Sequence, residues 1–174
     1  MKVTRRLIVG ISGSSAPHVG VELLRALRAL GTVETHLVIS AGARRTIELE
    51  LGIDPDAVGE LADVTYAPGD LAAAISSGSF QTIGMVVAPC SVRTLAAVAT
   101  GNTTDLLTRA ADVCLKERRR LVLAVRETPL NLIHIRNMEA VTLAGAVVLP
   151  PVVAFYHRPE TINDVLLQIV SGRW

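Results

Sequence analysis

Short apolar runs along the chain alternate with segments whose apolar residues recur at helical spacing. A run of four to eight apolar residues bounded by Gly, Pro or Ser indicates a buried strand. This pattern predicts strands at residues 7–11, 35–39, 64–66, 83–88, 121–125 and 146–149, with the fourth strand stopped at Pro89. Such continuously apolar strands are typical of a parallel sheet that helices cover on both faces.

Helical periodicity fills the spaces between these strands. Two apolar stripes are expected to face inward: Val19, Leu23, Leu24, Leu27 and Leu30 in the first helix, and Ile162, Val165, Leu166, Ile169 and Val170 in the last. Helices are also expected at residues 41–51 and 104–119, with Arg118-Arg119-Arg120 at a helix end and Pro129 at a first helical position. The βαβ alternation predicts a three-layer, Rossmann-like or flavodoxin-like doubly wound parallel sheet, with residues 1–174 in a single domain.

Composition narrows the class of protein. Half of the residues are apolar and only 3% are aromatic, so the core is expected to consist of Val, Leu, Ile and Ala. The formal net charge is +1, and the absence of a basic tract interleaved with aromatic residues argues against nucleic-acid binding. The longest apolar stretch, residues 141–155, contains Pro150-Pro151 and is too short for a membrane span. With no targeting pattern and two cysteines outside any metal-type spacing, we expect a cytoplasmic protein with reduced thiols and no membrane association.

Small polar residues gather in four segments that are predicted to follow strands: 10–15, Ser40, 76–79 and 89–94. Ligands of open α/β sheets bind beyond the carboxyl ends of the strands. The first segment is a strand–loop–helix unit whose amides and hydroxyls can hold a phosphate at a helix N-terminus, although it has neither GxGxxG nor P-loop spacing. Taken alone, it is equally an ordinary βα turn. The four segments together favour a phosphorylated, planar ligand.

A second group of residues combines basic and acidic side chains. It contains Arg109, Lys116, Arg126 and Glu127, joined later by Tyr156 and Arg173. Arg126 and Glu127 directly follow a predicted strand, whereas Lys116, taken alone, is more simply a surface lysine at a helix end. Several cations near one point suit a phosphate monoester. The four histidines lack ligand spacing such as HExxH, and Cys90 has no evident partner base, so neither a metal site nor a cysteine nucleophile is predicted.

Seven segments spread over essentially the whole chain form one ordered set: 10–13, 76–80, 89–95, 107–113, 115–119, 126–129 and 155–159. In this order and nearly this spacing they resemble the UbiX/Pad1 family of flavin prenyltransferases, homo-oligomeric flavin proteins with a Rossmann-like fold. The resemblance implies a transferase that joins a dimethylallyl group, from dimethylallyl monophosphate, to N5 and C6 of reduced FMN without a metal. It also implies a homo-oligomer, expected to be a dodecamer with flavin at subunit interfaces, and a UbiD-type decarboxylase that uses the prenylated FMN.

The resemblance assigns roles position by position. Flavin-contacting positions are matched by Ser12, Gly13, Ser40, Ser91, Thr94 and Arg109. The group that grips the prenyl phosphate is matched by Lys116, Arg126, Tyr156 and, after a one-residue shift, Arg173. Glu50 and Glu127 match carboxylates placed for proton handling, and with Lys116 they are the expected catalytic residues. The loop Ser14–His18 departs from the family's usual small residue, Gly, Ala and aromatic residue.

Two other functions remain open from the sequence. An FMN-dependent cysteine decarboxylase of the same superfamily would want a PASANT-type asparagine, where this chain has Ala88-Pro89-Cys90-Ser91-Val92-Arg93. A non-catalytic flavin-binding or delivery subunit would not need a grip on a second phosphate. The set formed by Lys116, Arg126, Glu127 and Tyr156 therefore argues for the transferase.

Overall fold

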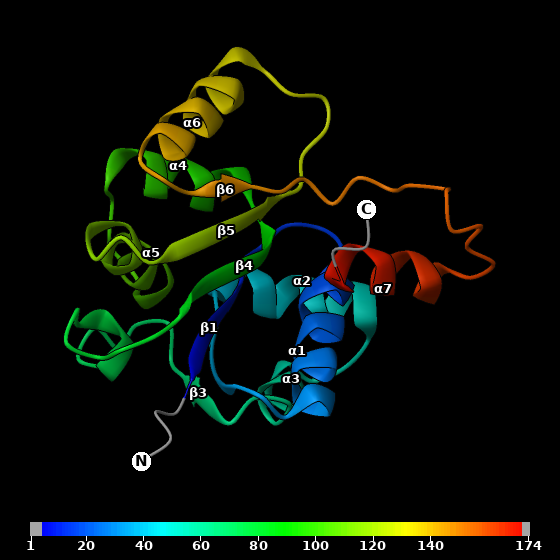
Figure 1. The fold of residues 1–174 in the computed structure, drawn as a ribbon, viewed down its shortest axis with the longest axis horizontal. Coiled ribbons are helices and arrows are strands. Elements are labelled where there is room, and N and C mark those ends of the chain that lie inside the picture. Colours follow the sequence, from blue (N-terminus) through cyan, green and yellow to red (C-terminus); the bar gives the residue numbers. More distant parts are fainter. Residues whose placement is uncertain (1–4, 172–174) are drawn as a thin grey trace.

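The computed structural model describes residues 5–171. Six parallel strands form one sheet in the order β3-β2-β1-β4-β5-β6 (Figure 1). The strands are β1 (Arg6–Ile11), β2 (Glu34–Ile39), β3 (Val64–Tyr66), β4 (Gly84–Cys90), β5 (Arg120–Val125) and β6 (Val147–Val148). This is the strand order of the Rossmann sheet, so the predicted doubly wound parallel α/β fold is confirmed.

Helices cover both faces of the sheet (Figure 1). One face carries α1 (His18–Leu30), α2 (Ala41–Leu51), α3 (Pro55–Gly59) and α7 (Ile162–Ser171), and the other carries α4 (Val92–Thr100), α5 (Leu106–Lys116) and α6 (Leu132–Leu143). A short 3-10 helix, Ala74–Ser76, precedes β4. Successive strand residues point to opposite faces, so Ile8 packs in the core shared with α5, whereas Val9 packs in the core shared with α1 and α2. The three-layer arrangement follows from this alternation.

The direction of winding reverses between the central strands β1 and β4. From β1 the chain continues outward through β2 and β3, and from β4 it continues outward through β5 and β6. Loops that leave two neighbouring strands in opposite directions open a crevice at the carboxyl ends of those strands. The segments after Ile11 and Cys90 border this crevice, which is where a ligand is expected.

The helix expected over residues 104–119 is shorter, because local contacts fix both of its ends. Asp105 accepts a hydrogen bond from the Thr108 amide at 2.8 Å and caps α5, which begins at Leu106. At the other end, Arg118 adopts a left-handed φ of 55°, outside the helical region. Arg118 and Arg119 therefore lie in the turn into β5, and Arg120 begins that strand. The expectation that the run Arg118–Arg120 ends a helix is wrong.

Proline positions were also misleading. Pro129 does not begin a helix. Asn131 accepts a hydrogen bond from the His134 amide at 2.9 Å and caps α6, which begins at Leu132, three residues after Pro129. Pro89 does not stop β4, which continues to Cys90. The pairing of β4 with β5 shifts in register just there, which accommodates a residue that cannot donate a backbone hydrogen bond.

Two residues of the predicted apolar stripes are exposed. Leu30, the last residue of α1, is 66% exposed, and Ile162, the first residue of α7, is 80% exposed. Each lies at a helix end beyond the part that packs on the sheet. Within residues 5–171, no helix is long and apolar enough to cross a membrane.

Candidate functional site

A pocket of about 390 Å³ opens at the carboxyl edge of the sheet, beside the crevice between β1 and β4. This volume lies within the range of small-molecule sites. Four strand ends contribute to its wall. The lining residues are Gly13, Ser14, Ser15, Ser40, Ala41, Gly42, Ser91, Val92, Arg93, Thr94, Asp105, Arg126 and Glu127. Three of the four polar segments predicted from the sequence therefore meet in one pocket.

The hydroxyl of Ser12 ties the two central strands together beneath this pocket. It donates to the Pro89 carbonyl at 3.0 Å and accepts from the Ser91 amide at 2.7 Å. The Ser12 side chain is fully buried, and Ser12 is not among the lining residues. Its hydroxyl thus holds the crevice in shape from below, whereas Gly13, the next residue, reaches the pocket.

Two helices begin at the pocket, each capped by a serine. The Ser40 side chain accepts from the Ala43 amide at 3.1 Å, and the Ser91 side chain accepts from the Thr94 amide at 3.2 Å. The Ser91 hydroxyl also donates to the Thr94 hydroxyl at 3.1 Å. The N-termini of α2 and α4 therefore both face the pocket with their partial positive charge, which favours an anionic ligand.

Glycines form the pocket wall where the loop after β1 meets α2. A Cβ on Gly13 would lie 2.9 Å from the Gly42 carbonyl carbon, so only glycine permits this close approach of the loop to the first turn of the helix. Both residues line the pocket. Backbone amides therefore form this part of the wall without side chains in front of them. A phosphate or another anionic group fits such a wall.

The end of β5 supplies the charged side of the pocket. Arg126 and Glu127 line it directly after the strand. The Arg126 amide donates to the Cys90 carbonyl at 3.1 Å, and the Ser14 hydroxyl donates to the Arg126 carbonyl at 2.9 Å. The Glu127 carboxylate accepts from the Thr128 amide at 2.9 Å. Backbone contacts thus fix both residues while their side chains stay partly exposed.

Glu50 lies on α2 and contacts the loop between β1 and α1. Its Oε2 accepts a hydrogen bond from the Ala16 amide at 2.9 Å. Ala16 has a φ of 67°, a region that is unfavourable for residues with a Cβ. The contact between Glu50 and Ala16 thus helps to hold the loop Ser14–His18 in this conformation.

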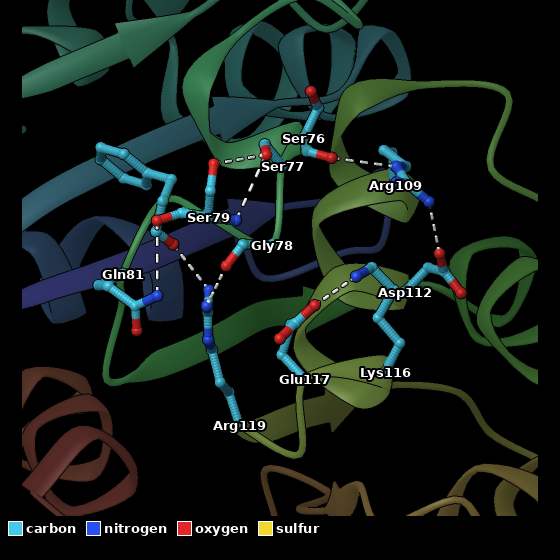
Figure 2. Close-up of polar contacts among 11 residues, drawn as sticks. Ser76, Ser77, Gly78, Ser79, Gln81, Arg109, Asp112, Lys116, Glu117 and Arg119 are labelled. Carbon is cyan, nitrogen blue, oxygen red and sulfur yellow. Dashed lines mark hydrogen bonds and ion pairs between the residues drawn. The ribbon is translucent and has the colours of Figure 1, made fainter.

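Arg109 and Lys116 lie on α5, outside the residues that line the pocket (Figure 2). Arg109 donates to the Ser76 carbonyl at 3.2 Å and to Asp112 at 2.7 Å. Lys116 pairs with Glu117 at the end of the helix. The six residues of β5 separate that end from Arg126, a span of about 20 Å. One chain therefore does not bring Lys116 and Arg126 together.

The remaining predicted residues lie toward the C-terminus. Tyr156 is 89% exposed on the segment between β6 and α7, and it does not line the pocket. Arg173 lies outside the described residues. The structure thus places Gly13, Ser40, Ser91, Thr94, Arg126 and Glu127 around the pocket, Ser12 beneath it and Glu50 behind its loop.

Comparisons with known proteins identify the family. The Flavoprotein family model matches residues 1–171. Flavin prenyltransferase UbiX of Escherichia coli (strain K12) is 56% identical over 167 residues, which cover 96% of this chain and 88% of that protein. The probable UbiX-like flavin prenyltransferase of Bacillus subtilis (strain 168) is 53% identical over 165 residues, 95% of this chain and 80% of its own. The chain belongs to the UbiX family of flavin prenyltransferases.

Solved structures of UbiX proteins superpose closely. AnUbiX (PadA1), in complex with FMN and dimethylallyl pyrophosphate, has a TM-score of 0.96 at 50% identity, covering 98% of this chain and 90% of its own. The dodecameric FMN-dependent UbiX-like decarboxylase of Escherichia coli O157:H7 has a TM-score of 0.94 at 50% identity, covering 96% and 91%. The FMN-dependent cysteine decarboxylase TvaF has a TM-score of 0.69 at 18% identity and shares the fold alone.

One polar segment of the chain lies elsewhere than expected. Ser76–Ser79 does not follow a strand: it precedes β4 and contacts α5. Arg119 donates to the Gly78 carbonyl at 2.5 Å and to the Phe80 carbonyl at 2.7 Å, which fixes the segment there (Figure 2). The prediction that all four segments share one edge of the sheet is therefore wrong for this one.

Both cysteines of the chain are buried. Burial raises the pKa of the Cys90 thiol to about 12 and that of Cys114 to about 11. A thiolate, the reactive form, is disfavoured at both positions. This agrees with the interpretation of Cys90 as a structural residue and not a nucleophile. No group of three or more His, Cys, Asp or Glu side chains among residues 5–171 has the arrangement of a metal site.

The sequence prediction missed three residues of the pocket wall, which are Ala41, Gly42 and Asp105. It included Ser14, Ser15, Val92 and Arg93 in its polar segments but gave them no individual role. Asp105 had a recognisable signal, since Asp followed three residues later by Thr is a capping pattern that α5 uses. Ala41 and Gly42 carry no side-chain signal, because their contribution is made by the backbone at the start of α2.

Proposed function

We propose that this protein is a flavin prenyltransferase that joins a dimethylallyl group from dimethylallyl monophosphate to N5 and C6 of reduced FMN. The observation that carries the proposal is the pocket between the capped N-termini of α2 and α4, beside Arg126 and Glu127, in a chain more than half identical to named flavin prenyltransferases. Reduced FMN supplies the nucleophilic N5 and C6. The chain must supply binding, charge neutralisation and a route for a proton.

The pocket offers a separate group for each of these tasks. The helix N-termini at Ser40 and Ser91 suit the acidic parts of FMN. Arg126 lines the pocket and supplies a cation for the prenyl phosphate, whose leaving oxygen gains negative charge as the carbon–oxygen bond breaks. Glu127 is a partly exposed carboxylate beside it and is suited to accept the proton lost from C6. Together they allow prenyl transfer without a metal.

In this proposal, a second copy of the chain supplies the site residues that lie away from the pocket of their own chain. Lys116 and Arg109 lie on α5 away from the pocket of their own chain, and Tyr156 is exposed. The same chain exposes large apolar residues on α6 and on the segment that carries Tyr156: Leu132, Ile133, Ile135, Leu143, Val152, Val153 and Phe155. Exposed large apolar residues in such number on neighbouring stretches of the sequence are typical of surfaces buried between subunits. A homo-oligomer, as a dodecamer, would bring α5 of one copy to the pocket of another.

The product would serve a UbiD-type decarboxylase, and this part rests on the resemblance of the sequence. The rival function of a cysteine decarboxylase has less support, since the cysteine decarboxylase TvaF is only 18% identical. A delivery subunit without activity would not require Arg126 and Glu127 at the wall of the same pocket.

Mass spectrometry of the flavin tests the proposal. Purified protein is mixed with reduced FMN and either dimethylallyl monophosphate or the pyrophosphate named in the AnUbiX complex. We expect a flavin heavier by one prenyl unit, formed faster from the monophosphate. Unchanged FMN with both donors, in protein that has bound FMN, would contradict the transferase function. Faster reaction of the pyrophosphate would contradict only the choice of donor.

A further inference from the structure

Glu117 is a carboxylate at the end of α5 that has no role in the function proposed above. Lys116 donates a hydrogen bond from Nζ to Glu117 Oε1 (Figure 2), and the two side chains are 46% and 35% exposed. Lys116 is the last residue of α5, and Glu117 is its C-terminal cap. The ammonium group that is proposed to hold a phosphate thus already has an anionic partner in its own chain.

The helix end does not by itself favour a carboxylate at this point. The C-terminus of a helix carries partial negative charge, which attracts Lys116 and repels Glu117. The hydrogen bond from Lys116 and the positive charge of Lys116 nonetheless hold the pKa of Glu117 below its usual range, with a smaller contribution from Arg119. The ionised Glu117 therefore depends mainly on Lys116 for compensation of its charge.

The backbone at Gly78 leaves room for this pair. A Cβ on Gly78 would lie 2.8 Å from Glu117 Cδ and 2.9 Å from Lys116 Nζ. The loop cannot easily move aside, because Arg119 holds the Gly78 and Phe80 carbonyls. A fixed loop without a side chain at Gly78 thus lets the Glu117 carboxylate reach Lys116.

The neighbouring arginines are engaged in a different way (Figure 2). Arg109 and Arg119 each donate to backbone carbonyls of the segment from Ser76 to Phe80. These contacts fix the loop, and an incoming anion would have to break them. Lys116 instead pairs with a partly exposed side chain, which can rotate away without breaking a backbone contact. Lys116 is therefore the cation of this cluster that an anion can recruit most easily.

We propose that Glu117 is a displaceable counter-ion of Lys116, which competes with the prenyl phosphate and promotes release of inorganic phosphate after transfer. The inference rests on the proposed role of Lys116 in holding that phosphate. Before the donor binds, Glu117 keeps the ammonium group in place. Once the prenyl phosphate has paired with the Lys116 ammonium group, the nearby Glu117 carboxylate repels the phosphate. After the reaction, Glu117 replaces the phosphate as the partner of Lys116. Glu117 acts only through Lys116 and is a positioning residue.

Inhibition by inorganic phosphate tests this role in protein loaded with FMN. Glu117→Gln should make phosphate a stronger inhibitor by about two- to fivefold, the order of an exposed ion-pair interaction. The KM for the prenyl donor should fall by a similar factor, with no increase in kcat and no change in FMN affinity. Glu48→Gln is the matched control, since Glu48 forms an exposed pair with Arg45 at 3.1 Å on α2; it should leave the inhibition unchanged.

A double variant separates this inference from the function on which it rests. In a Lys116→Met background, Glu117→Gln should have no further effect on phosphate inhibition. Weaker or unchanged inhibition in Glu117→Gln alone, with normal FMN content, overturns the counter-ion role and leaves prenyl transfer standing. If Lys116→Met changes neither phosphate inhibition nor prenyl transfer, the role of Lys116 itself is wrong and the counter-ion role fails with it.

Discussion

Removal of the Ser12 hydroxyl should lower the free energy of unfolding and should have only a small effect on FMN binding. This fully buried group bonds to the Pro89 carbonyl at 3.0 Å and to the Ser91 amide at 2.7 Å. In Ser12→Ala the Pro89 carbonyl keeps its bond from the Ser12 amide at 3.1 Å, but the Ser91 amide loses this partner. A buried donor left unpaired costs about 1–3 kcal/mol. We expect the free energy of unfolding to fall by about 2 kcal/mol and the Tm by about 4–8 °C.

Urea unfolding followed by circular dichroism measures this change, with and without FMN and at matched protein concentration. FMN affinity should fall modestly, because Ser91 caps α4 and lines the pocket. Ser15→Ala is the control, since Ser15 lies in the same loop and lines the pocket; its unfolding free energy should change by less than about 0.5 kcal/mol. Wild-type stability of Ser12→Ala combined with loss of FMN binding would refute the reasoning and show that Ser12 touches the flavin.

Four further outcomes are expected. Arg126→Gln should keep FMN bound and slow single-turnover prenyl transfer by a factor of about 10²–10³. Glu127→Gln should slow the same step by a factor of about 10²–10⁴ without weakening donor binding. Loss of FMN with an unchanged rate per bound flavin would contradict both predictions. Ala16→Gly should raise the unfolding free energy by about 0.5–1 kcal/mol, because Ala16 has a φ of 67°, and a lower Tm would count against this. Hydrogen bonds from the amide and hydroxyl of Thr35 lower the pKa of Asp63, so the stability that they provide is present above the unfolded value of about 3.9 and is lost as the pH falls through the lower folded value. Asp63→Asn should flatten the acid limb of stability against pH, and an unaltered limb would argue against this contribution.

Periodicity was sufficient to predict most of the sheet and the helices that pack on it. The strands β1, β2, β4 and β5 are largely buried on both faces, as strands inside a parallel sheet are, and most of their residues are apolar. The pattern did not predict α4, whose capping residue Ser91 was taken only as part of a ligand loop. Both interpretations hold for Ser91, because a capped helix N-terminus is itself an anion site.

Spatial arrangement was harder to predict than the choice of residues. A small polar segment looks alike before and after a strand, which is why Ser76–Ser79 was placed at the wrong edge of the sheet. The positions of Lys116 and Arg126 in the sequence did indicate that the two residues lie apart in one chain. A crossover helix runs antiparallel to its strands, so a residue at the end of α5 and a residue after the end of β5 must lie at opposite edges. That separation, more than any single contact, points to a site shared between copies.

Complementation between two inactive variants tests the central claim most directly. Lys116→Met and Arg126→Met chains are each purified alone and also co-expressed as mixed oligomers, and formation of prenylated FMN is measured by mass spectrometry. If the pocket of one copy uses Lys116 of another, each variant alone is inactive and an equal, random mixture regains about a quarter of the wild-type activity, because about a quarter of its sites combine two intact contributions. A mixed oligomer with bound FMN and no more activity than either variant alone would contradict the account.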